Sequence, residues 1–112
     1  KIGRGAFSHN LKLTSVTLED VTELGDYAFG SSTELTSVTL GQLTKIGEYA
    51  FFECPNLESV EIPNSVQTIG GYAFENCSAL SSVTIGESVT RIGCDAFKRS
   101  GLTSVVLPNS LE

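Results

Sequence analysis

The chain has 112 residues, of which 40% are hydrophobic and 18% are charged, and its formal net charge at pH 7 is -6. The hydrophobic fraction argues against disorder, and the excess of acidic residues disfavours nucleic acid and anionic membrane surfaces as partners, because both are bound through clustered Lys and Arg. No apolar run approaches the ~20 residues that a membrane-spanning helix requires, so we expect no insertion into a membrane.

An Ala-Phe pair recurs five times, at intervals of 22 or 23 residues, and marks each unit of a repeat. The pairs are Ala6-Phe7, Ala28-Phe29, Ala50-Phe51, Ala73-Phe74 and Ala96-Phe97. The full repeat reads L-x-S-V-x-L-x-x-x-V-x-x-I-G-x-x-A-F-x-x-[CNS], with one extra residue before the aliphatic-Gly step in the last two complete units. A unit this short cannot bury its apolar face alone, so the pattern predicts a single stacked array over residues 1–112.

Each unit begins with a segment of period-two hydrophobicity, which is typical of a strand with one buried face. In the first unit we expect Leu13, Val16 and Leu18 to point inward, and Ser15 and Thr17 to point outward. Stacking the units predicts a parallel sheet of five strands, with one phenylalanine from each unit forming an internal aromatic stack. The members of this stack are Phe7, Phe29, Phe51, Phe74 and Phe97.

The second half of each unit is expected to be less regular. A short extended segment is predicted at Val66 to Ile69 and at its counterparts, and the glycine that follows permits a tight turn or a close backbone approach. The segment Asp26 to Phe29 is too short for an independent helix, so we expect at most one helical or 3₁₀ turn there.

Residues 57–77, LESVEIPNSVQTIGGYAFENC, closely resemble the BspA-like, or Treponema-type, leucine-rich repeat, and the resemblance covers essentially the whole chain. It departs where Pro63 is replaced by Glu19 and Gly41 in earlier units, and where Cys54 gives way to Ser32. The resemblance implies an α/β solenoid dominated by strands: a right-handed array of about five units, with a concave parallel sheet and short helical or 3₁₀ turns. It also implies a cell-surface or secreted protein that adheres to extracellular-matrix proteins such as fibronectin or fibrinogen.

Cysteine and histidine are placed where they do not predict catalysis. Cys54 and Cys77 occupy the same position in adjacent units, where either a disulfide or two buried thiols could form, and we favour thiols that bond to neighbouring backbone. Cys94 is expected to be an exposed thiol, and His9 lies several units away from it, beyond the reach of a Cys-His nucleophile pair. No zinc signature or phosphate-binding loop is present, so we expect no enzyme, no metal and no cofactor.

Two columns of outward strand residues form the candidate binding site. Small hydroxyl residues also suit stacked strands and can hydrogen-bond along the stack, and for the unvarying serine column we favour that architectural interpretation. The second column varies from Thr to Glu to Val, as a partner surface would, and curved solenoids bind through such concave faces. The candidate residues are Ser15, Thr17, Ser37, Thr39, Ser59, Glu61, Ser82, Thr84, Ser104 and Val106.

The leading functional hypothesis is therefore a non-enzymatic module that binds a protein partner. A structural spacer that presents another domain is the alternative, and an ice-binding face is disfavoured because Glu58 and Glu61 interrupt the threonine columns. The chain contains no Met, so we expect it to be a piece of a longer protein. Neither end carries a polar cap, which predicts further repeats or end-to-end self-association.

A second outward line consists of Tyr27, Tyr49 and Tyr72, with Gly5 and Asp95 at the same position in the end units. Stacking between units is the simpler explanation of this line, although Tyr is also enriched at interfaces.

Overall fold

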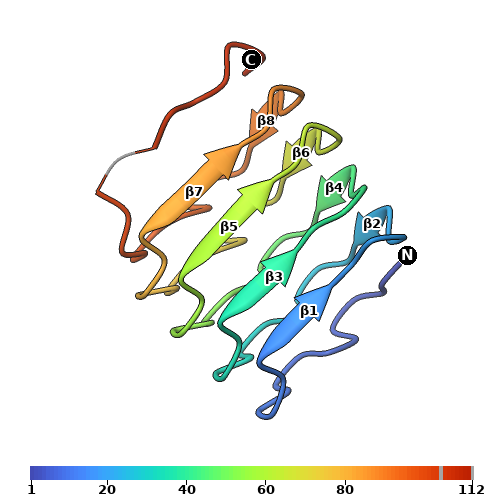
Figure 1. Cartoon of the computed structure of the whole chain (residues 1–112), viewed down its shortest axis with the longest axis vertical. Helices are drawn as coiled ribbons and strands as arrows, with labels where there is room; N and C mark the ends of the chain where they lie inside the picture. The colour runs from blue at the N-terminus through green and yellow to red at the C-terminus, as the bar shows by residue number, and fades with distance from the viewer. Residues whose placement is uncertain (104, 112) are drawn as a thin grey trace.

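The computed structural model describes residues 1–103 and 105–111 and shows a solenoid with two parallel four-stranded sheets (Figure 1). The first sheet has the order β1-β3-β5-β7, so the chain makes three full turns between its outer strands. Its strands are β1 (Ser15–Thr17), β3 (Ser37–Thr39), β5 (Ser59–Ile62) and β7 (Ser82–Ile85). The second sheet contains β2 (Glu23–Leu24), β4 (Lys45–Ile46), β6 (Thr68–Ile69) and β8 (Arg91–Ile92).

Burial along the strands follows the predicted alternation. In β5, Val60 and Ile62 are buried while Ser59 and Glu61 are exposed, because successive side chains point to opposite faces of a sheet. Equivalent residues of successive repeats pair in register, as Ser59 does with Ser82. The predicted strand and the second extended segment are therefore both confirmed.

The expectation of five stacked strands is not confirmed, because the first sheet has four strands within the residues that the structure describes. Residues 105–107, which were expected to form the fifth strand, belong to none. In the second sheet, the first repeat contributes only an isolated bridge between Ile2 and Leu24. Rungs at the ends of a stack have a neighbour on one side only, and they lose half of the hydrogen bonds that hold a strand in place.

The expected helical or 3₁₀ turns are also absent, since the described residues contain no helix. Two overlapping β-turns replace them, closed by hydrogen bonds from Ala28 N to Gly25 O (3.2 Å) and from Gly30 N to Tyr27 O (3.1 Å). The φ angles of Tyr27 and Ser31 are 60° and 59°, in the left-handed region, which interrupts any right-handed helical run. The amide of Phe29 donates to Ala50 O of the next rung (2.8 Å), so it bonds to the neighbouring rung and does not form a hydrogen bond within a helical turn.

Phenylalanine side chains form the predicted aromatic stack through the middle of the solenoid. Phe29, Phe51 and Phe74 are buried, and ring centroids of neighbouring members of the column, from Phe7 to Phe97, lie 5.1 to 5.5 Å apart. The glycine after each aliphatic residue of the second sheet allows the backbones of successive rungs to approach closely. A Cβ at Gly70 would lie 2.5 Å from the backbone nitrogen of Glu48 in the preceding rung, a distance that no side chain tolerates.

The extra residue of the longer repeats is absorbed in the loop between the two sheets. Between β5 and β6 this loop places the hydroxyl of Ser65 2.6 Å from Leu43 O of the preceding rung, to which it donates a hydrogen bond. Pairing resumes in register directly afterwards, with Thr68 opposite Lys45 and Ile69 opposite Ile46. The insertion therefore changes the loop and leaves the strands in place.

Candidate functional site

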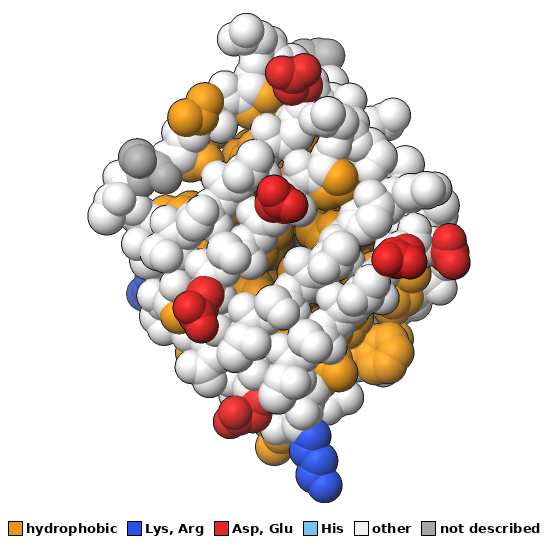
Figure 2. All heavy atoms as spheres, viewed as in Figure 1, with side chains coloured by type: hydrophobic (Ala, Val, Ile, Leu, Met, Phe, Trp, Pro, Cys, Tyr) orange, Lys and Arg blue, Asp and Glu red, His pale blue; other side chains and the backbone are white. Residues whose placement is uncertain are grey.

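The first sheet presents the predicted binding columns on one exposed face, which we call the hydroxyl face. Figure 2 looks onto this side of the molecule, where polar side chains with scattered carboxylates cover the strands. All eight predicted residues on the four strands are exposed: Ser15, Ser37, Ser59, Ser82, Thr17, Thr39, Glu61 and Thr84. Val106 is 87% exposed in the segment that follows the last repeat, and Ser104 lies outside the described residues.

Side-chain hydrogen bonds along the stack come from residues outside the hydroxyl face, among them threonines. Thr36 directly precedes β3, whereas Thr44 and Thr90 directly precede β4 and β8 of the second sheet. The hydroxyls of Thr36, Thr44 and Thr90 donate to backbone carbonyls of the preceding rung at 3.0 to 3.3 Å. In contrast, the eight strand residues of the hydroxyl face make no side-chain hydrogen bond within the described parts of the chain. The architectural interpretation of the serine column is therefore not supported, and its hydroxyls are available to water or to a partner.

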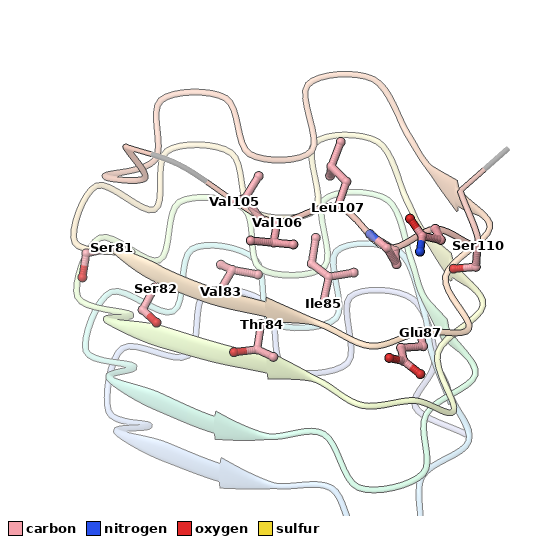
Figure 3. A pocket seen from close by; sticks show the side chains of 12 residues that line it. Ser81, Ser82, Val83, Thr84, Ile85, Glu87, Val105, Val106, Leu107 and Ser110 are labelled. Carbon is pink, nitrogen blue, oxygen red and sulfur yellow. The ribbon is translucent and has the colours of Figure 1, made fainter.

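Two hollows lie along the hydroxyl face. One, of about 900 Å³, opens over β3, β5 and β7, and its charged lining residues are Glu61 and Glu87. The position of Glu87 is fixed through its backbone amide, which donates to the side-chain oxygen of Asn64 (2.9 Å). The second hollow, of about 890 Å³, lies between β7 and residues 105–110, and its lining includes Ser82 and Thr84 of the strand and Val106 and Leu107 of the following segment (Figure 3). The face thus offers hydroxyls and carboxylates at its centre and apolar side chains at one end.

Cys54 and Cys77 are buried free thiols, as we favoured, and each donates to a backbone carbonyl. The Cys54 Sγ lies 3.4 Å from Phe29 O, and the Cys77 Sγ lies 3.1 Å from Phe51 O. Hydrogen bonding to Cys54 and burial both raise the pKa of Cys77, which keeps this thiol protonated and unreactive at neutral pH. Ser32, in the same column, is buried and its hydroxyl has no partner among the described residues. These three side chains are part of the buried interior of the solenoid.

A tyrosine strip runs along the turns that follow the second sheet. Tyr27, Tyr49 and Tyr72 are half-buried, and their rings stack with centroids 4.7 and 4.8 Å apart. Phe52 packs edge-on against Tyr49 at 5.3 Å, and the guanidinium of Arg4 lies 5.6 Å from the centroid of Tyr27. The stacking was predicted, but the role of Arg4 was not. The sequence signal that could have indicated this role is that Arg4 directly precedes Gly5, which occupies the tyrosine position in the first unit.

Across residues 1–103 and 105–111, no three His, Cys, Asp or Glu side chains gather where they could hold a metal ion. The same part of the chain contains no helix with the length and apolarity to cross a membrane.

Comparison with known proteins identifies close structural relatives. A model of the BspA-type leucine-rich repeat region, in six copies, matches residues 1–112. The crystal structure of a leucine-rich repeat protein of T. pallidum superposes with a TM-score of 0.92 at 34% identity, covering 96% of this chain and 51% of that protein. No protein with a curated description matches the chain.

Two further crystal structures extend the comparison. A leucine-rich repeat protein from Eubacterium ventriosum gives a TM-score of 0.88 at 26% identity, covering 97% of this chain and 30% of its own. A leucine rich cell surface protein from Faecalibacterium prausnitzii gives 0.66 at 30% identity, covering 97% and 37%. The chain therefore spans about half or less of the length of the proteins that it resembles.

Proposed function

Because the chain belongs to the BspA-type leucine-rich repeat family, we propose that it is a non-enzymatic, protein-binding module of a cell-surface or secreted adhesin-like protein. Its partner is a host or extracellular-matrix protein, with fibronectin and fibrinogen as the first candidates, and the hydroxyl face is the contact surface. The description of the Faecalibacterium relative as a cell surface protein supports this location.

One observation carries the proposal: the hydroxyl face is exposed, and the side chains of its strand residues have no hydrogen-bond partner within the described chain. Thr36, Thr44 and Thr90, which lie outside this face, donate hydroxyl hydrogen bonds between rungs, and the outward hydroxyls of the strands take no part in them. A regular row of free donors and acceptors, with a hollow of about 900 Å³ along it, suits an extended segment of another protein.

The test is binding of the chain to immobilised fibronectin, fibrinogen and a panel of other matrix proteins. The variant Ser59→Arg/Thr84→Arg places two bulky cations on the hydroxyl face and is expected to lower affinity at least tenfold. The matched control is Gln67→Arg/Ser78→Arg, which adds the same charge at two exposed positions away from both hollows and is expected to bind like the wild type. Circular dichroism and urea unfolding establish that all three proteins fold alike.

Equal binding by both variants would remove the hydroxyl face from the proposal. If the wild type bound no protein of the panel, the alternative of a structural spacer would replace it, since a spacer tolerates any soluble substitution on this face.

End-to-end association belongs to the same proposal. Phe7 and Leu11 are 42% and 60% exposed at one end of the stack, and Val106 and Leu107 are 87% and 55% exposed towards the other. Further repeats or a second copy would cover these side chains. Sedimentation velocity over a hundredfold range of concentration is expected to show oligomers, and a monomer throughout would exclude self-association of this chain.

A further inference from the structure

The two ends of the tyrosine strip are chemically different. At one end, the guanidinium of Arg4 covers the outer face of Tyr27 at 5.6 Å from the ring centroid, within the range of a cation–π interaction. At the other end, the next rung carries Cys94 and Asp95, both exposed, at the positions that Arg4 and Gly5 occupy in the first rung. Within the described residues, no aromatic ring or cation stacks on the outer face of Tyr72.

The backbone holds these tyrosines in a conformation that their side chains disfavour. The φ angles are 60° at Tyr27, 57° at Tyr49 and 58° at Tyr72, whereas the end rungs place Gly5 and Asp95, residues better suited to this region, at the same position. Non-glycine residues in the left-handed region concentrate at functional sites, because the strain persists only where something compensates for it. Tyr49 has a stacking partner on both faces of its ring, and Tyr27 has Tyr49 on one face and Arg4 on the other, so stacking can compensate for the strain at both residues. Tyr72 has a stacking partner, Tyr49, on only one face.

A carboxylate lies near the uncovered end, and two more lie near the middle ring of the strip. Hydrogen bonding to Cys94 and the nearby carboxylate of Asp95 raise the pKa of Tyr72 to about 12, so the phenol is neutral under physiological conditions. The pKa of Tyr49 is raised as well, first by desolvation, then by the neighbouring Tyr27, and to a smaller extent by the carboxylates of Glu75 and Glu48. A neutral aromatic face beside carboxylates attracts a cation, and the contact of Arg4 with Tyr27 is an example within this chain.

We propose that the outer face of Tyr72, together with the carboxylate of Asp95, binds an arginine side chain of a protein partner, in the way that Arg4 packs on Tyr27. The site lies on the turn edge of the solenoid and is separate from the hydroxyl face, so it stands independently of the function proposed above. An arginine fits better than a lysine because its planar guanidinium stacks on a ring and can donate to a carboxylate at the same time.

The probe is a blocked tripeptide, N-acetyl-Gly-Arg-Gly-amide, titrated into the isotope-labelled chain and followed by NMR. We expect millimolar binding, with shifts concentrated at Tyr72 and Asp95. The lysine counterpart should bind more weakly, and the glutamate counterpart should cause no shifts. Tyr72→Ala and Asp95→Asn are each expected to weaken binding about two- to fivefold, whereas Tyr72→Phe, which keeps the ring face, should retain it.

Removing a cation supplies the sharper test. Arg4→Ala uncovers the outer face of Tyr27 and should add a second set of shifts around that ring. The matched control Lys12→Ala removes an equal charge at an exposed position away from the strip and should add none. This arm remains informative even if Tyr72→Ala fails to fold.

The proposal is overturned if the arginine peptide shifts the hydroxyl face instead of Tyr72, if Asp95→Asn binds like the wild type, or if Arg4→Ala and Lys12→Ala behave alike. The Ser59→Arg/Thr84→Arg variant should bind the peptide about as well as the wild type does. Loss of matrix-protein binding in that variant, with peptide binding kept, would separate the two sites.

Discussion

Two aromatic columns run through the same repeats, and they respond differently to the ends of the array. The phenylalanine column continues through all five Ala-Phe pairs, whereas the tyrosine column, two residues earlier in each unit, is confined to the three central ones. The ring spacings are similar, 5.1 to 5.5 Å in the phenylalanine column and 4.7 to 4.8 Å in the tyrosine column, because the distance between rungs sets both. Burial distinguishes them: Phe51 is fully buried, and Tyr49 is only half-buried. Stacking alone therefore does not require an aromatic residue in every unit, whereas burial of the ring does.

The largest effect is expected from breaking the phenylalanine column at its centre. Phe51→Ala removes a fully buried ring that stacks on Phe29 and Phe74, and should lower the free energy of unfolding by about 3 to 5 kcal/mol. Urea denaturation measures this loss.

The control for that measurement is the same substitution at the end of the column. Phe7 is 42% exposed, so Phe7→Ala should cost only about 1 to 2 kcal/mol. Equal losses at the two positions would mean that burial does not set the difference between central and end rungs.

A smaller effect, with an informative sign, is expected from the tyrosine column. Tyr49→Ala removes two stacked contacts and one edge contact but keeps a side chain at a φ of 57°, and should cost about 1 to 2 kcal/mol. Tyr49→Gly loses the same contacts but relieves the left-handed strain, and should be more stable than the alanine variant by about 1 kcal/mol. If alanine proved the more stable, strain would not explain why Gly5 stands at this position in the first rung.

The pattern of apolar residues was sufficient to predict the stacking, because inward residues such as Val60 and Phe51 recur at fixed intervals that only a solenoid can bury together. The turns could not be predicted in the same way. Tyrosine is a poor indicator of left-handed backbone, so at most one helical or 3₁₀ turn was predicted for Asp26 to Phe29. Gly5 and Asp95, at the position of Tyr27 in the end units, carried the correct signal.

For the candidate residues, the sequence was enough to predict exposure on the strands but not the hydrogen bonding of their hydroxyls. The outward serines and threonines lie where period two requires. Whether their hydroxyls are satisfied depends on geometry between rungs: the hydroxyl of Thr36 donates to the preceding rung, whereas that of Ser37 beside it makes no hydrogen bond among the described residues. Which partner the face binds depends on shape and charge outside the repeat pattern.

The smallest effect concerns the ionisation of Tyr72. Its pKa is raised from 10 to about 12 in the folded chain, first by hydrogen bonding to Cys94. A phenol with a higher pKa when folded stabilises the fold while it is neutral, so this contribution should be complete below pH 10 and lost as the pH rises towards 12. Stability measured across this range should decline less steeply in Tyr72→Phe. An identical decline in both proteins would place the alkaline sensitivity elsewhere.

The loop that carries Ser65 has a consequence for how such proteins change in length. Two of the repeats contain one residue more than the others, yet Thr68 still stands opposite Lys45, and Ile69 opposite Ile46. A gene that gains or loses a codon here alters the outline of one edge without shifting any strand. The same loop is therefore the natural place for an engineer to graft a foreign peptide, displayed once per turn at the spacing of the rungs.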